Sequence, residues 1–496
     1  MDTNIAYGLM LATLGFFGYI GYQAATEKDL NADEYLSARG TQSWMRIGLS
    51  LFASGMGIWI LFGPSEVGYW GGFWDVVGYA VSAATPFLLL AYVGPKIRER
   101  LPDGVTLADY VRMRIGRPMQ IYVGIISVVY MFTFLFAEFT AIGKAMNVLS
   151  DMEPLIPMLA VGVVTAAYTA YGGLPASLQT DRFQAWVVLW LIVALFLVLF
   201  AGDLSNLISD AKAYNPESDT NWSIGSMSYM DSFKSGLALV IAITAAEMFS
   251  QGNWQRAWAS EDEEALKKGS LLAAGLVLPV VFIMGVLGTV AAAKGTAEDP
   301  SAAFFVLLGD AHALIIAGFI VLGIALVCSS VDTLQNAVSA SITRDLADGK
   351  MELKHARIVT VAMIPIAIYL ATGPTIGNFT FDAYSVFGIF LFADLLAAAT
   401  VLPVLLTLWD RVDSRASLAG AVCGLLSVVV YGMYTADLST GIAYLTSPTN
   451  ELGLANLEVF LSALIGSGLV TLIGSEVLAN SSKEINPISG ANLEAE

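Results

Sequence analysis

Apolar stretches of about twenty residues recur along the whole chain and are separated by short polar segments. A helix needs about 20 mainly apolar residues to cross the hydrocarbon core of a bilayer, so each such stretch predicts a membrane span. The pattern therefore predicts an all-α polytopic membrane protein. We expect thirteen spans, at residues 4–22, 45–63, 73–94, 119–147, 155–171, 179–201, 231–254, 267–293, 311–340, 355–373, 380–408, 417–434 and 456–478.

The composition agrees with this prediction. Of the 496 residues, 56% are hydrophobic and 13% are charged, whereas soluble domains average about 25% charged. The net charge of −18 argues against a nucleic-acid partner. The two cysteines, Cys328 and Cys423, both fall inside predicted spans, so we expect neither a disulfide framework nor a thiolate metal site. The first residues lack the basic segment of a cleavable signal peptide.

Lysine and arginine gather in alternate loops, which predicts the orientation. Twenty of the 24 basic residues fall on one side, and the other side holds only Lys144, Lys212, Lys234 and Lys294. Since basic loops stay in the cytoplasm, we expect the N-terminus outside and the C-terminus inside, in the cell membrane.

The order of spans predicts two inverted groups of five within one transporter domain, 1–496. Residues 45–201 form the first group and 231–408 the second. Residues 4–22 are a peripheral helix, 417–478 hold two C-terminal helices, and 479–496 form a cytoplasmic tail. Gly55, Gly57, Gly63 and Pro64 interrupt the first span of the first group, as in the broken helices of inverted-repeat transporters.

Residues 322–336 form an apolar helix that carries Ser329, Ser330, Asp332 and Thr333. Hydroxyl and carboxylate oxygens suit hard cations, and an ionisable residue inside a membrane is a functional candidate by default. Asp181 is expected at the same depth as Asp332, where the two carboxylates would hold a cation. The alternative is that Asp181 caps its own helix or pairs with its neighbour, Arg182.

Other carboxylates fall within or beside predicted spans, at Glu66, Glu138, Glu247 and Asp394. They would contact a cationic or zwitterionic substrate or carry a proton; the alternative is a neutral or lysine-paired structural carboxyl, with Lys144 as a partner. Aromatic residues would line a cavity or form an interfacial belt. The candidate substrate contacts are Trp59, Glu66, Glu138, Glu247, Gln251 and Trp254.

Several motifs together resemble the sodium:solute symporter family, which includes carriers of proline, sugars, sialic acid, pantothenate and urea. The resemblance covers nearly the whole chain. Its motifs are Asp33-Glu-Tyr-Leu-Ser-Ala-Arg39-Gly, Ser50-Leu-Phe-Ala-Ser-Gly-Met56, Tyr171-Gly-Gly-Leu with Gln179-Thr-Asp181-Arg-Phe-Gln184, Gln251 to Gln255-Arg256, and Cys328-Ser-Ser-Val-Asp332-Thr333.

The resemblance implies a fold like that of the leucine transporter, a five-plus-five inverted repeat with flanking helices. It implies a principal sodium site made by the carbonyls of Ala53, Met56 and Leu326 and the hydroxyls of Ser329 and Ser330. It also implies a second sodium site at Asp181, Asp332 and Thr333, with Ser329 shared. Gly55 and Gly57 stand where several relatives have polar residues, so no side-chain ligand is expected from that segment.

The predicted function is a sodium-coupled symporter that imports a small organic solute by alternating access. Acidic groups outnumber basic ones near the expected cavity, which favours an amino acid, amine or urea-like solute. The chain has no Walker motif and no informative nucleophile–base pair, so we expect no enzyme. The alternatives are a substrate sensor, disfavoured because the chain ends soon after the last span, and a sodium-independent facilitator. The expected partners are the solute, sodium ions and lipid, with no obligatory protein partner.

Overall fold

The structure, a computed structural model, describes residues 1–26, 31–200, 209, 229–294, 300–309, 311–376, 379–380, 385–451 and 453–481. Long helices dominate this part of the chain, as the apolar pattern predicts. The longer helices are α1 (Thr3–Thr26), α3 (Trp44–Gly55), α5 (Phe73–Arg100), α7 (Arg117–Ser150), α8 (Leu155–Phe200), α10 (Met230–Glu247), α12 (Glu263–Lys294), α14 (Ala313–Ala340), α15 (Leu353–Ala371), α16 (Val386–Leu405), α17 (Ser414–Thr435) and α19 (Leu457–Ser481).

Short elements connect these helices. They are α2 (Ala32–Ser37), η1 (Ile58–Leu61), α4 (Gly63–Gly71), α6 (Leu107–Ile115), α11 (Gln251–Ala259), η2 (Pro300–Ala302), α13 (Ala303–Val306), the π-helical η3 (Ser341–Leu346), η5 (Leu406–Leu408) and α18 (Leu438–Tyr444). Two short strands, β1 (Thr375–Ile376) and β2 (Phe379–Thr380), pair antiparallel with Thr375 opposite Thr380.

Helix α8 is a hairpin of two spans joined without a loop. A straight helix of its 46 residues would be about 69 Å long, more than twice the bilayer core. At Gly173 the backbone is non-helical, with φ +55° and ψ −148°. The second arm then runs antiparallel to α14, because Ser177 contacts Asp332 near one end of α14 and Ile192 lies beside Phe319 near the other.

Two further spans are broken near their middle. The axes of α3 and η1–α4 differ by 57°, and those of α10 and α11 by 58°. The first break lies where the glycines predict it. The second is a correction, since residues 231–254 were expected to be one continuous span. A polar run at Ser250–Asn253 interrupts the apolar pattern there, without the glycine–proline signal of the first break.

The described helices correspond to the thirteen predicted spans. Ten of them are long and apolar enough to cross a membrane, the two bent pairs bring the number to twelve, and the reversal within α8 brings it to thirteen. Some boundaries differ. The first broken span continues to Gly71 rather than ending at residue 63, and α16 begins at Val386 rather than at residue 380, because Phe379 and Thr380 belong to β2.

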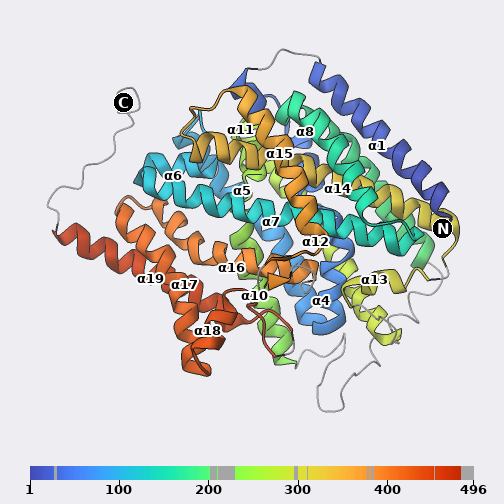
Figure 1. The fold of residues 1–496 in the computed structure, drawn as a ribbon. Helices are drawn as coiled ribbons and strands as arrows, with labels where there is room; N and C mark the ends of the chain where they lie inside the picture. The colour runs from blue at the N-terminus through green and yellow to red at the C-terminus, as the bar shows by residue number, and fades with distance from the viewer. Residues whose placement is uncertain are drawn as a thin grey trace.

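Helix α14 forms the centre of the bundle, and every residue of its second half is buried. The polar residues of this half, Ser329, Ser330, Asp332 and Thr333 among them, are therefore buried inside the bundle. Helix α1 covers one edge of the molecule, and α17, α18 and α19 gather at the opposite edge (Figure 1). The two broken spans open the two predicted groups of five.

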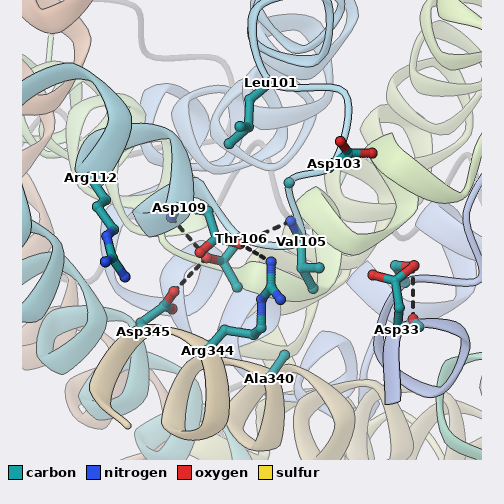
Figure 2. Close-up of polar contacts among 12 residues, drawn as sticks. Asp33, Leu101, Asp103, Val105, Thr106, Asp109, Arg112, Ala340, Arg344 and Asp345 are labelled. Carbon is teal, nitrogen blue, oxygen red and sulfur yellow. Dashed lines mark hydrogen bonds and ion pairs between the residues drawn. The ribbon is translucent and has the colours of Figure 1, made fainter. Parts of the chain in front are cut away.

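Basic residues converge at one end of the molecule, which we call the basic end. Arg39 donates to the carbonyls of Pro102 and Gly104, and Arg98 contacts Ser260. The short helix α6 lies at this end. Figure 2 shows how its N-terminus is held against η3, which continues α14.

Candidate functional site

The break between α3 and η1 is held open by a carboxylate from another helix. Helix α3 ends at Gly55, and η1 begins at Ile58. Glu138 of α7, fully buried, accepts the backbone N–H of Ile58 at 2.9 Å and that of Trp59 at 3.2 Å. A Cβ at Gly57 would lie 2.3 Å from a Glu138 oxygen, so a larger residue there would displace this carboxylate.

Opposite this break, α14 brings together four of the five oxygens predicted for the principal sodium site. The Ser329 hydroxyl lies 2.8 Å from the Ala53 carbonyl oxygen and 2.9 Å from that of Leu326. The Ser330 hydroxyl lies 3.1 Å from the same Leu326 oxygen. The fifth predicted oxygen is the carbonyl of Met56, the residue that directly follows α3.

All of these predicted ligands are buried, and each offers a neutral oxygen. Carbonyl and hydroxyl oxygens are hard donors, which suits a hard cation such as sodium. Among the described residues, no group of three or more His, Cys, Asp or Glu could hold a metal ion. The donor set at the break thus fits an alkali ion and contains none of the nitrogen or sulfur ligands that transition metals prefer.

The second predicted sodium site contains a buried ion pair. Arg256 of α11 contacts the Asp181 carboxylate at 2.6 Å, and both side chains are fully buried. The same guanidinium donates to Thr333 at 2.7 Å and to Ser50 at 2.7 Å. The partner of Asp181 is therefore Arg256 rather than Arg182, and Asp181 lies within the second arm of α8 rather than at a helix N-terminus.

Asp332, the other carboxylate of that site, is surrounded by hydroxyls. It accepts Tyr168 at 2.6 Å and Ser177 at 2.7 Å, from the two arms of α8, and Thr180 at 3.0 Å. The Thr333 hydroxyl lies 3.4 Å from the same Asp332 oxygen that accepts Ser177. Three hydroxyl donors compensate this buried carboxylate without a cation.

The basic end is closed by side chains from several helices. All nine residues of α11 are buried. Thr106, which caps α6, donates to Asp345 at 2.6 Å, and Arg344 contacts Asp109 at 3.4 Å (Figure 2). These contacts join α6 to η3, and the Arg256 network joins α11 to α14 at the same end.

A separate cavity lies between the breaks in the two bent spans. Its walls are acidic and aromatic: Trp59, Tyr79, Tyr130, Phe134, Ile243, Glu247, Phe387, Phe390 and Asp394. Edge-to-face ring pairs order this wall, with Trp59 centred 5.9 Å from Tyr79 and 6.4 Å from Phe390. No lysine or arginine is among these lining residues.

One of the cavity carboxylates has a fixed orientation. The Glu247 carboxylate accepts the Tyr130 hydroxyl at 2.6 Å and the Asn253 amide at 2.8 Å. Glu247 is the last residue of α10, so the break in the second bent span brings it to the cavity. Asp394, 3% exposed, reaches the same cavity from α16.

Of the predicted substrate contacts, Trp59 and Glu247 line this cavity. Glu138 lies at the break beside the sodium ligands. The Gln251 side chain instead accepts a hydrogen bond from the backbone N–H of Leu107 and donates one to the Ser127 hydroxyl.

Two more predicted contacts are also absent from the cavity lining. Trp254 donates its indole N–H to the Met248 carbonyl, and Glu66 lies on α4.

Sequence reasoning missed two features of this site. The aromatic wall residues Tyr79, Tyr130, Phe134, Phe387 and Phe390 have no distinguishing local pattern, because they lie in spans that are apolar throughout. Arg256 did carry a signal. It ends the quoted motif that begins at Gln251, and a motif arginine beside an apolar span needs a buried acidic partner.

Known proteins resemble this chain over most of its length. The model of the sodium:solute symporter family matches residues 35–424. The spermidine transporter DUR31 of Candida albicans is 30% identical over 441 residues, which are 86% of this chain and 79% of that one. Sodium/proline symporter 2 of Staphylococcus saprophyticus is 25% identical over 473 residues, 88% of each chain.

Solved structures show the same fold. A Na+-coupled sialic acid symporter, in a substrate-bound outward-open state, matches with a TM-score of 0.75 at 14% identity, over 95% of this chain and 97% of that one. The transporter MhsT in complex with L-phenylalanine matches with a TM-score of 0.54 at 14% identity, over 88% and 99% of the two chains. The all-helical fold like that of the leucine transporter is thereby confirmed.

Proposed function

Because this chain belongs to the sodium:solute symporter family, we propose that it is a sodium-coupled symporter that imports a small organic cation by alternating access. As a member of that family it is a membrane transporter and not an enzyme. One observation carries the proposal: the hydroxyls of Ser329 and Ser330 meet the Ala53 and Leu326 carbonyls at the break of α3.

Sodium at this point would add ligand bonds between two elements that already meet through the hydrogen bond from Ser329 to the Ala53 carbonyl. Ala53 and Met56 belong to the bent span, whereas Ser329 and Ser330 belong to α14. Bound sodium would hold the bend against α14 and so favour the closed basic end. Its loss would free that end to open. A ligand shifts such an equilibrium only by its differential affinity for the two states, and the shared ligands supply that difference.

The proposed orientation has the basic end in the cytoplasm and the N-terminus outside, in the cell membrane. One sodium ion driven inward by about 100 mV and a tenfold gradient supplies about 3.7 kcal/mol, enough for roughly 500-fold accumulation of a neutral solute. A cationic solute would gain further from the same potential.

The cavity favours an amine as the solute. Glu247 and Asp394 face a space walled by aromatic rings, and no basic side chain lines it. Carboxylates with aromatic faces are the combination that recognises organic ammonium groups. A relative at 30% identity is a spermidine transporter, which supports this choice. Sodium/proline symporters at 25% identity make a zwitterionic amino acid the second candidate.

Ser329, Asp332, Thr333 and Asp181 remain proposed ligands of a second sodium ion. Arg256 contacts two of them, Asp181 and Thr333. We therefore propose that the second site forms only in a state in which Arg256 has withdrawn from Asp181.

Uptake into proteoliposomes tests the function. Labelled spermidine, putrescine and proline are offered with external sodium, and again with sodium replaced by choline. We expect an amine to accumulate only with sodium. Equal uptake in choline would refute symport and favour the sodium-independent facilitator.

A thermal-shift screen of solute classes tests the choice of solute. Glu247→Gln should lower the affinity for amines at least tenfold, since a desolvated charge pair is lost. The affinity is read from the amine concentration at which the melting temperature rises. Stabilisation by carboxylates but by no amine would refute the amine assignment.

A further inference from the structure

The Glu138 carboxylate lies between the predicted sodium ligands and the wall of the cavity. Its Oε2 accepts both the Ser330 hydroxyl at 2.6 Å and the backbone N–H of Ile58 at 2.9 Å, and its Oε1 accepts the backbone N–H of Trp59 at 3.2 Å. Its side chain is fully buried. Ser330 is a predicted sodium ligand, and Trp59 lines the cavity. Glu138 therefore contacts both parts of the proposed machinery without belonging to either.

We propose that Glu138 is the counter-ion of the sodium bound at Ala53, Leu326, Ser329 and Ser330, and that it acts on the ion through Ser330. It is thus a positioning residue that connects sodium occupancy to Trp59. This inference rests on the proposed function, because it assumes that sodium binds there.

A negative group beside the site would balance the charge of the bound ion. The predicted ligands are carbonyl and hydroxyl oxygens, all neutral and all buried. An ion transferred from water to such a site loses hydration that neutral dipoles replace only in part. Among the described hydrogen-bond partners of these ligands, Glu138 is the carboxylate.

The hydrogen bond to Ser330 also improves that hydroxyl as a ligand. A serine hydroxyl has one proton to donate and two lone pairs. Of the three acceptors near Ser330, the Glu138 oxygen is the closest, at 2.6 Å against 3.1 and 3.2 Å for the Leu326 and Val327 carbonyls. With its proton directed at a carboxylate, the hydroxyl presents its lone pairs to the cation and carries more negative charge.

The chain makes room for this arrangement at Gly57. Its backbone is in an ordinary extended conformation, with φ −76°, so glycine is not needed there for its torsion angles. It is needed because a Cβ would lie 2.3 Å from a Glu138 oxygen. Gly57 and Glu138 thus form one unit at the break, and shortening the acid should make room for a larger residue at 57.

A purely structural role is the competing explanation, in which Glu138 only holds the N–H groups of the broken helix. The two roles predict different effects of changing the charge and the length of the side chain at position 138. A structural role makes shape decisive, so a shortened carboxylate disturbs the protein at least as much as an amide of equal length. A counter-ion role makes charge decisive, so the amide is the worse substitution.

The test is sodium titration of the full-length purified protein without solute, read as the rise in melting temperature relative to choline. We expect Glu138→Gln to weaken sodium affinity at least tenfold and Glu138→Asp to weaken it less. The matched control is Glu66→Gln, another largely buried carboxylate, on α4, for which affinity should stay within twofold of wild type.

A second pair of variants decides the matter if Glu138→Gln does not fold. Gly57→Ala should weaken sodium affinity by displacing the carboxylate, and adding Glu138→Asp should restore part of it. Sodium affinity within twofold of wild type in Glu138→Gln, or in Gly57→Ala, would overturn the counter-ion role, as would a loss in Glu138→Asp as large as in Glu138→Gln. A wild-type protein with no sodium-specific stabilisation would instead refute the proposed function itself.

Discussion

Replacing Ser329 with alanine should weaken sodium binding strongly while leaving the fold intact. The hydroxyl is fully buried and lies within 2.9 Å of two carbonyl oxygens that are themselves predicted ligands. Its removal deletes one of two side-chain ligands and leaves the Ala53 and Leu326 carbonyls without a bridging donor when sodium is absent.

The size of the expected loss in sodium affinity follows from the charge of the ion that the Ser329 hydroxyl would bind. An interaction between a hydroxyl and an ion is worth about 1.5–3 kcal/mol, so sodium affinity should fall about 10- to 150-fold. The neutral hydrogen bonds of the same hydroxyl contribute about 1 kcal/mol to folding, a small part of the total stability. Binding should therefore suffer much more than folding.

The assay is the sodium concentration that gives half-maximal uptake, together with the melting temperature in choline. Ser65→Ala is a matched control, because Ser65 is also fully buried and its hydroxyl also bonds two backbone carbonyls, those of Phe62 at 2.8 Å and Leu61 at 3.2 Å. We expect a shift of at least tenfold in Ser329→Ala and none in Ser65→Ala. An unchanged sodium dependence in a well-folded Ser329→Ala protein would refute the assignment of this site.

Three further predictions concern the other polar clusters. Arg256→Met leaves Asp181 as an uncompensated buried carboxylate and should cost about 3–5 kcal/mol of stability. The double variant with Asp181→Asn should recover part of the lost melting temperature, and no recovery would argue against the Arg256–Asp181 ion pair. Asp332→Asn should reduce the Hill coefficient for sodium toward one, whereas an unchanged coefficient above one would exclude a second ion there. The hydrogen bond from Arg112 keeps the pKa of Asp348 below its ordinary value. The contribution of this ion pair to stability is therefore complete above about pH 4 and is lost as pH falls through that lowered pKa. Asp348→Asn should remove this pH dependence from melting curves recorded between pH 2.5 and 6.

Much of the fold followed from the sequence because membrane spans are long and their apolar character is local. The first break was also predictable, since Gly55, Gly57 and Pro64 weaken the helix where it bends. The second break was not, because the bend after Glu247 depends on the packing of α11 against α3 and α14. The polar residues from Ser250 to Asn253 were its only local sign.

The candidate sodium ligands were found because Ser329 and Ser330 belong to a motif that could be matched directly. Their neighbours could not be found in this way. Glu138 and Ser330 are 192 residues apart, and Arg256 and Asp181 are 75 apart. Such contacts depend on how helices cross. The roles of these carboxylates therefore appeared only once their partners were known.

The hairpin of α8 has a kinetic consequence. Its two arms are joined at Gly173 without a loop, and both bind Asp332, through Tyr168 on the first arm and Ser177 and Thr180 on the second. Because this part of α14 holds both arms through a single carboxylate, we expect the three hydrogen bonds to break together when this end opens. Opening at this end should accordingly be cooperative, with a single high barrier and few intermediates, and single-molecule recordings should show two dwell states rather than a continuum.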